Sequence, residues 1–243
     1  MRGIAAYGVY VPYWRLDRKT IASALGVAAA SGTRSVASYD EDTTSLGAEA
    51  ARAAVRAAPR LGPEALYFAT AQPAYLDKTN ATAIHAALDL APSTPAFDMV
   101  GAVRSGSGAL RAALDARGYA LVVLSDIRTG LPGSADEREG GDGAVAFLCG
   151  DDSPDSPVLA EPVAFGSATA EFLERAAPDQ LIAMVSLADG CDVTVWRVTG
   201  AVAARRPAAA VAKELEGGGA VSYANFLTWR GFLRREPPRR PDP

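Results

Sequence analysis

The stretch of sequence that decides the fold is residues 95–110, PAFDMVGAVRSGSGAL. Its first half, Ala96–Val100, is a short apolar run of the kind that forms a β-strand, and its second half is a run of small residues that suits a helix. The two halves meet at a turn that contains Gly101. Because a helix N-terminus offers unpaired N–H groups and a positive dipole end, a ligand or a reactive group is expected at this turn.

Strand-like and helix-like segments alternate on both sides of this stretch. Asp17 stands at the start of one expected helix, and the acidic residues 40–42 stand at the start of another that runs to about residue 56, where capping is favoured over metal binding. The expected strands are apolar on both faces, as in a sheet covered by helices on both sides, and they occupy residues 3–10, 65–71, 96–100, 120–125 and 143–150. The sequence therefore predicts an α/β fold.

The last third of the chain repeats part of this pattern. Residues 181–200 read as two apolar strands joined at an Asp-Gly turn, a weaker copy of the pair expected over 120–150. A short helix is expected near 171–175 and an Ala-rich helix over 201–213. After residue 220 the sequence predicts an aromatic helix and a linker-like Pro/Arg-rich tail. These features suggest an internal duplication whose second copy is mostly missing.

Composition excludes several classes of function. The net charge of −4 gives no general reason to bind nucleic acid or an anionic membrane, and no apolar run is long enough to span a bilayer. The N-terminus lacks the apolar run of a signal peptide, so a cytoplasmic location is expected. Cys149 and Cys191 show no spacing that indicates a disulfide or a metal site, and both are expected to be structural, as is His85.

Five stretches together resemble one known family. They are GIAAYGVYVPYWRLDRKTIA at residues 3–22, SYDEDTTSLGAEAARAAV at 38–55, FATAQPAYLDKTNATAIHAAL at 68–88, AFDMVGAVRSGSGALRAAL at 96–114 and SDIRTGLPGSADEREGGDGAVAFL at 125–148. The family is the thiolase superfamily, and within it hydroxymethylglutaryl-CoA synthase with its archaeal and actinobacterial relatives.

The resemblance implies a thiolase-like αβαβα layered sandwich with one complete lobe and a remnant of the second. The complete lobe is expected over residues 1–165, the remnant over 166–220, and the aromatic helix and tail over 221–243. In some relatives the tail leads into a zinc-ribbon/OB-fold acyl-CoA-binding domain, so a separate partner of that kind is expected. The resemblance also implies a coenzyme A thioester as ligand.

The resemblance further implies where catalytic residues should stand. The family's nucleophilic cysteine matches Val103, which cannot attack a thioester, and its general-base glutamate matches Ala71, which is followed by Gln72. The family's histidine belongs to the missing part of the second lobe. All three catalytic positions are therefore vacant, and no covalently bound cofactor or acyl group and no metal are expected.

Other residues near these positions offer weaker candidates. Ser105 and Ser107 stand at the start of the helix, where capping is the favoured role. Tyr75 and Asp77 form a polar pair after the vacant glutamate position, and some thiolase-like aldolases use tyrosine-based acid/base chemistry without the cysteine. Two hypotheses stay open: a protein that is inactive by itself, or a non-covalent acyl-CoA condensing or aldol-type enzyme that a partner subunit completes.

The central strand also predicts an assembly. In the family this strand lies at the sheet edge and pairs with its copy in a second subunit. Ala96–Val100 contains no Pro or Lys of the sort that protects a free edge from strand addition. A homodimer through this strand is therefore expected.

Overall fold

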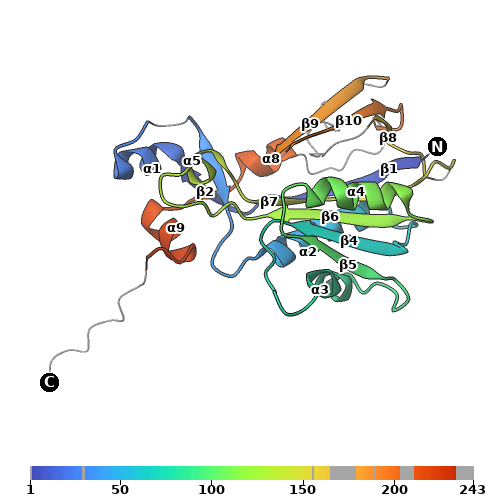
Figure 1. Ribbon diagram of the computed structural model, residues 1–243, viewed down its shortest axis with the longest axis horizontal. Coiled ribbons are helices and arrows are strands. Elements are labelled where there is room, and N and C mark those ends of the chain that lie inside the picture. The colour runs from blue at the N-terminus through green and yellow to red at the C-terminus, as the bar shows by residue number, and fades with distance from the viewer. Residues whose placement is uncertain are drawn as a thin grey trace. The chain divides into compact units, whose positions relative to one another are not determined.

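A computed structural model describes residues 2–28, 31–154, 156–164, 179–188, 190–202 and 211–233 (Figure 1). The chain divides into two compact units. The first contains Met1–Val11, Asp42–Asp126 and Gly143–Glu216, and the second contains Pro12–Glu41, Ile127–Asp142 and Gly217–Pro243. The expected lobe boundaries near residues 165 and 220 stay predictions. The helix expected near 171–175, most of the one expected over 201–213 and the side chain of Cys191 lie outside the described residues.

The first unit is built on a mixed sheet, eight-stranded over the described residues, in the order β5-β4-β6-β7-β1-β8-β10-β9. Strands β4, β5 and β6 are parallel, and the other pairings are antiparallel. Strand β5 lies at one edge, as expected of the central strand. The strands are β1 Arg2–Tyr10, β4 Ala65–Thr70, β5 Ala96–Val100, β6 Ala120–Asp126, β7 Gly143–Asp151, β8 Ala160–Ala164, β9 Leu181–Ala188 and β10 Gly190–Val198.

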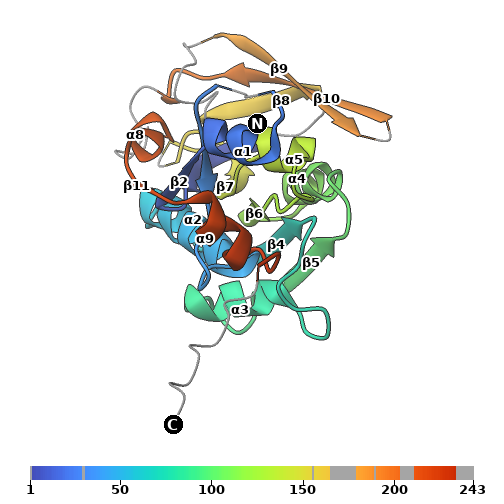
Figure 2. The same ribbon diagram turned by 90° about the vertical axis from the view of Figure 1, so that its left-hand side faces the viewer.

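Helices cover both faces of this sheet, as the two-sided apolar strands predict. Helix α2 (Thr43–Ala57) packs on β1, β6 and β7, and α4 (Ser105–Asp115) packs on the opposite face of β4 and β6 (Figure 2). Helix α3 (Asn80–Ala87) packs on α2 and β5. Helix α8 (Val211–Glu216) is the last element of this unit along the chain. The core under α4 is apolar and includes Leu110, Phe147 and Trp196, each fully buried. The α/β class is confirmed.

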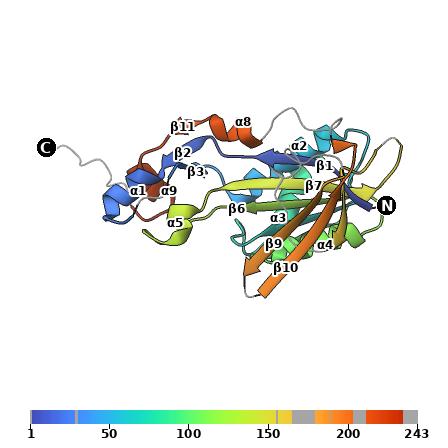
Figure 3. The same ribbon diagram turned by 90° about the horizontal axis from the view of Figure 1, so that it is seen from above.

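Two local predictions are also confirmed. The carboxylate of Asp42 accepts a hydrogen bond from the Ser45 N–H at 2.7 Å and caps α2. Strands β9 and β10 pair antiparallel across the Asp-Gly region, and Figure 3 shows them side by side. None of the helices within the described ranges is both long and apolar enough to cross a membrane.

The second unit has a small sheet of its own. Strands β2 (Trp14–Asp17) and β3 (Thr33–Val36) pair antiparallel, and β11 (Gly219–Ala220) joins β2 in parallel. The sequence did not indicate β2 and β3, because their residues WRLD and TRSV lack an apolar run. Helices α1 (Arg18–Leu25), α5 (Ala135–Glu139) and α9 (Tyr223–Trp229) complete the unit, with Asp17 capping α1 as expected.

A buried ionic cluster ties three chain segments of the second unit together. Asp142, whose side chain is fully buried, accepts a hydrogen bond from Arg34 at 3.0 Å and forms a second ion pair with Arg230. Both guanidinium groups approach the Phe226 ring, with their central carbons 5.0 Å (Arg34) and 5.1 Å (Arg230) from the ring centre. Burial lowers the pKa of Arg34, and the Asp142 carboxylate opposes that shift. The aromatic helix is therefore anchored by charge as well as by apolar contacts.

Candidate functional site

The carboxyl ends of three parallel strands meet at one edge of the large sheet. Thr70 at the end of β4 pairs with Val100 at the end of β5, and β6 ends beside them at Asp126. From β5 the chain turns at Gly101, whose φ of +97° suits glycine, and enters α4. The Gly101 N–H donates to the Thr70 carbonyl oxygen at 3.2 Å. The turn is therefore fixed to the neighbouring strand.

A cavity of about 140 Å³ lies where these strand ends meet the start of α4. Val103 and Ala71 both line it, so the structure brings together the two positions that the sequence identified as vacant. Val103 is 53% exposed. The other lining residues are Ala69, Thr70, Ala102, Gly106, Leu124, Ser125 and Asp126.

Asp126 is the one ionisable residue among the described residues that line this cavity, and no sequence motif had indicated it. Its Oδ1 accepts hydrogen bonds from the Thr70 hydroxyl at 3.0 Å and from the Ala71 N–H at 2.8 Å. A carboxylate therefore stands beside the vacant glutamate position, supplied by the adjacent strand. Its place directly after an apolar strand could have indicated it, because parallel strands that are neighbours end side by side.

A larger cavity of about 310 Å³ lies on the face of the sheet that α4 covers. Leu124, Ser125 and Asp126 line both cavities. The rest of its lining comes from the end of β1, the start of β7 and α8, namely Val9, Tyr10, Val11, Gly143, Ala144, Val145 and Val211. The Asp126 carboxylate is thus shared by a small cavity and a larger, mainly apolar one.

The expected capping role of Ser105 and Ser107 is wrong. The residue before α4 is Arg104, in helical conformation and with no capping side-chain bond, and Ser105 is already the first helical residue. Ser107 is buried, and its hydroxyl has no hydrogen-bond partner among the described residues. The turn enters the helix directly, which leaves no extended residue from which a serine could cap it. Neither serine has an imidazole beside it that could activate it.

Tyr75 and Asp77 are not among the residues that line either cavity. Their loop is held by Asn80, whose side chain bonds both the N–H and the carbonyl of Tyr75 at 2.9 Å. The Lys78 ammonium lies 3.7 Å from the centre of the Tyr75 ring. The structure therefore does not bring this pair to the vacant positions.

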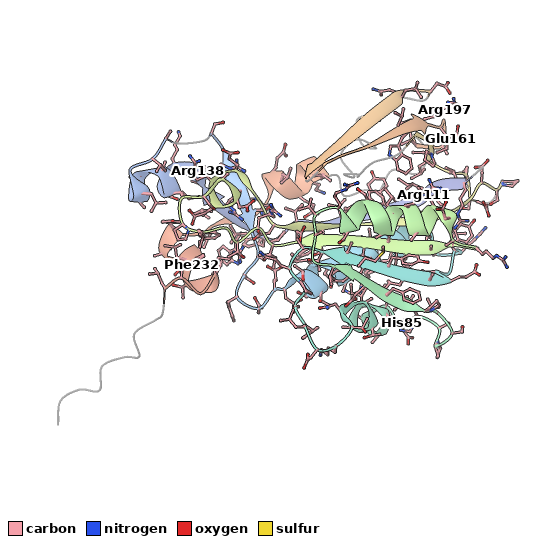
Figure 4. The ribbon with its side chains drawn as sticks, in the orientation of Figure 1. His85, Arg111, Arg138, Glu161, Arg197 and Phe232 are labelled. Carbon is pink, nitrogen blue, oxygen red and sulfur yellow. The ribbon has the colours of Figure 1, made fainter. Side chains whose placement is uncertain are left out.

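The remaining titratable candidates, His85 and Cys149, do not line either cavity. His85 lies on α3, where Figure 4 labels it, and its Nε2 is 3.1 Å from the carbonyl oxygen of Ala91. Cys149 is fully buried in β7, and that burial raises the pKa of its thiol to about 12. Within the described ranges, no group of three His, Cys, Asp or Glu residues could hold a metal ion.

The arrangement suits binding better than covalent chemistry. Alanine, valine and leucine side chains enclose most of the smaller cavity, so it can accept a short apolar group. The Asp126 carboxylate can accept a proton or a hydrogen bond at its edge. Among the described residues that line the smaller cavity, no side chain is a thiol or an amine.

The curated proteins to which this chain is similar include several hydroxymethylglutaryl-CoA synthases. The chain is 34% identical over 163 residues to the hydroxymethylglutaryl-CoA synthase of Pyrococcus furiosus, a match that covers 63% of this chain and 46% of that protein. It is 33% identical over 187 residues to the synthase of Aeropyrum pernix, covering 71% and 52%. The chain thus spans about half the length of these curated relatives. No family model matches it.

Solved structures agree. The PksG HMG-CoA synthase of Bacillus subtilis is 26% identical with a TM-score of 0.55, over 62% of this chain and 41% of that one. The HMG synthase of the curacin biosynthetic pathway, in complex with its holo donor-ACP, superposes with a TM-score of 0.74 at 17% identity, over 94% and 88%. The second likeness supports the fold alone.

Proposed function

The chain is a hydroxymethylglutaryl-CoA synthase-like member of the thiolase superfamily, and from this premise we propose that it binds an acyl-CoA thioester without becoming acylated and is catalytically inactive by itself. One observation carries the proposal: Val103 and Ala71, which match the family's nucleophile and base, line the same cavity and offer neither a nucleophile nor a base. The surrounding alanine and leucine side chains still suit a short acyl group.

Mass spectrometry of the intact protein tests the absence of covalent chemistry. After incubation with acetyl-CoA the mass should be unchanged, because the described residues that line the cavity include no thiol and no hydroxyl with a base beside it. Isothermal titration with acetyl-CoA should nevertheless show binding. An acetyl adduct mapped to Ser105 or Ser107 would contradict the proposal, as would the absence of any binding.

Val103→Cys is the matched variant, because it restores a thiol at the turn. A helix N-terminus favours the thiolate, so this variant should gain one acetyl group from acetyl-CoA. It should still fail to form a condensation product with acetoacetyl-CoA, since Ala71 supplies no base. Condensation by the single variant would show that the other catalytic roles are filled.

The alternative, a non-covalent condensing or aldol-type enzyme, is favoured by one specific contact. Asp126 is held against the Ala71 N–H at 2.8 Å, so a carboxylate remains beside the vacant base position. If it acts as a base, the methyl protons of bound acetyl-CoA should exchange in D2O, as followed by NMR, and Asp126→Asn should abolish the exchange. Absence of exchange in the native chain would exclude this alternative.

A homodimer through β5 belongs to the same proposal. Strand β5 pairs only with β4 among the described strands, and Phe97 on it is 49% exposed and stacks on Tyr67 with ring centres 5.8 Å apart. Phe97→Lys should convert a dimer into a monomer in sedimentation velocity, whereas Leu76→Lys, at a residue 91% exposed outside β5, should not. A native chain that sediments as a monomer would rule the dimer out.

The test must spare Asp98, although that residue lies in the same strand. Its carboxylate accepts hydrogen bonds at 2.7 Å from the N–H groups of Asn80 and Ala81 at the start of α3. A lysine there would disturb α3 as well as the strand edge.

A zinc-ribbon/OB-fold acyl-CoA-binding partner remains a further proposal, and co-purification of such a protein with the chain would test it.

A further inference from the structure

The larger of the two cavities, of about 310 Å³, has a floor made by three apolar side chains from neighbouring strands. Val9 on β1 pairs with Val145 on β7, and Val145 pairs in turn with Leu124 on β6. Residues paired in register point to the same face of a sheet, because side chains alternate between the faces along each strand. All three pack against the apolar core under α4. They form a continuous apolar strip across the sheet.

This strip leads to the smaller cavity, where the proposed function places the acyl group of a CoA thioester. Leu124, at one end of the strip, lines both cavities, as does Asp126, two residues further along β6 and on the same face. The smaller cavity has a volume of about 140 Å³, so it holds only a short group. An acyl chain that extends past Leu124 enters the larger cavity and follows the strip.

The lining of the larger cavity suits an alkyl chain better than the pantetheine arm of coenzyme A. The amide groups of that arm lose hydrogen bonds to water on burial and need replacements, which valine and leucine side chains do not supply. An alkyl chain needs none. Ligand cavities range from about 300 to 1,000 Å³, so this one stands near the lower limit and fits a chain of medium length.

Charge at the cavities narrows the acyl group further. Among the described residues that line either cavity, Asp126 carries the single carboxylate, and there is no lysine, arginine or histidine. A carboxylate at the far end of an acyl chain would therefore be buried without a counter-charge, in the neighbourhood of a like charge. The lining favours a chain that ends in a methyl group.

We propose that the ligand of this chain is the CoA thioester of an uncharged, medium-length alkyl acid, with its alkyl chain lying on Val9, Val145 and Leu124. This inference rests on the proposed acyl-CoA binding and names the substrate class of that site. The thioester lies in the smaller cavity beside Val103 and Ala71, and the larger cavity measures the length of the chain.

Isothermal titration of the native chain with a series of acyl-CoA thioesters tests the inference. From butanoyl- to octanoyl-CoA, Kd should fall about fourfold for each added methylene group, because each one is transferred from water to an apolar surface. Equal Kd values for butanoyl- and octanoyl-CoA, with binding intact, would overturn the chain-length inference alone. Failure of every thioester in the series to bind would instead overturn the proposed function.

Val9→Phe tests whether the strip holds the alkyl chain, because the larger side chain occupies part of the cavity. The ratio of Kd between butanoyl- and octanoyl-CoA should fall to about one in this variant. Val27→Phe is the matched control: the same change, at a residue of the second unit that is 38% exposed and lines neither cavity, should keep the native ratio. Far-UV circular dichroism checks that both variants are folded. A native ratio in Val9→Phe would overturn the inference, even if both thioesters bound more weakly, since an equal loss would place the pantetheine arm in this cavity.

A pair of thioesters with the same chain length tests the expected lack of charge. Glutaryl-CoA carries a carboxylate where pentanoyl-CoA ends in a methyl group. Glutaryl-CoA should bind the native chain at least about tenfold more weakly, since its carboxylate would be buried without a counter-charge. Equal affinities for the two thioesters would overturn the assignment of an uncharged chain.

Discussion

Two aspartates stand at the two ends of the excursion between β6 and β7, and their surroundings are opposite. Asp126 ends β6 beside a cavity and accepts bonds from two neutral donors, the Thr70 hydroxyl and the Ala71 N–H. Asp142, at the far end, is fully buried and pairs with Arg34 and Arg230. The first unit is held mainly by apolar packing around residues such as Leu110, Phe147 and Trp196. The second unit, with a small apolar core, depends on its charges.

The largest effect should come from Asp142→Asn. The change removes the charge that compensates Arg34 and Arg230, whose side chains are 0% and 5% exposed. Breaking a buried ion pair in this way costs about 3–5 kcal/mol, so the free energy of unfolding measured with urea should fall by that amount. Asp115→Asn, which breaks only the exposed pair with Arg111, should cost about 0.3–0.5 kcal/mol. Similar costs for the two variants would remove the distinction between the two aspartates.

A smaller loss is expected for Phe226→Leu. Leucine keeps most of the apolar contact with Leu16 and Ile21 but removes the aromatic face that both guanidinium groups approach. Desolvated cation–π contacts of this kind contribute about 2 kcal/mol, and urea denaturation should show a loss of that size. Ile84→Val, a buried apolar change in the first unit, should cost about 0.5–1.5 kcal/mol. A loss for Phe226→Leu no greater than that would mean that the ring only fills space.

Thr70→Val tests how much the hydrogen bonds of Asp126, the aspartate beside the cavity, contribute to stability. The change removes the hydroxyl that donates to Asp126 at 3.0 Å and accepts from the Gln72 N–H at 3.1 Å. Because Asp126 keeps its bond to Ala71, the expected cost is about 1 kcal/mol, measured by thermal or urea unfolding. A cost equal to that of Asp142→Asn would show that the carboxylate at the cavity is as indispensable as the buried one.

The smallest expected effect is a change in pH dependence. Burial, together with the hydrogen bond to Glu137, raises the pKa of Tyr223 to about 12 from its usual value of 10. Between pH 10 and about 12 the unfolded chain therefore binds fewer protons than the folded one, and the free energy of unfolding falls as pH rises through that window. Tyr223→Phe should flatten this fall, as measured by urea denaturation at successive pH values. An identical slope would show that Tyr223 ionises in the folded protein as it does in the unfolded one.

Most of the first unit could be predicted from the sequence because its elements are marked locally. Residues 65–71 and 120–125 are continuous apolar runs, and Asp42 precedes the helix that it caps. The capping of α4 was predicted wrongly for the opposite reason. Serines at a helix start have the right chemistry, but the conformation of Arg104 decides whether either of them is placed to cap.

The sequence by itself determined the alternation of strands and helices, the family resemblance and the absence of reactive side chains at residues 71 and 103. Those properties are set by residue type and by spacing along the chain. Only the tertiary structure decided that both vacant positions line one cavity, that Asp126 stands beside them, and that Asp142 joins Arg34 and Arg230 across 108 and 88 residues of chain. Contacts between distant segments depend on strand order and on how turns aim side chains, and no local pattern encodes either.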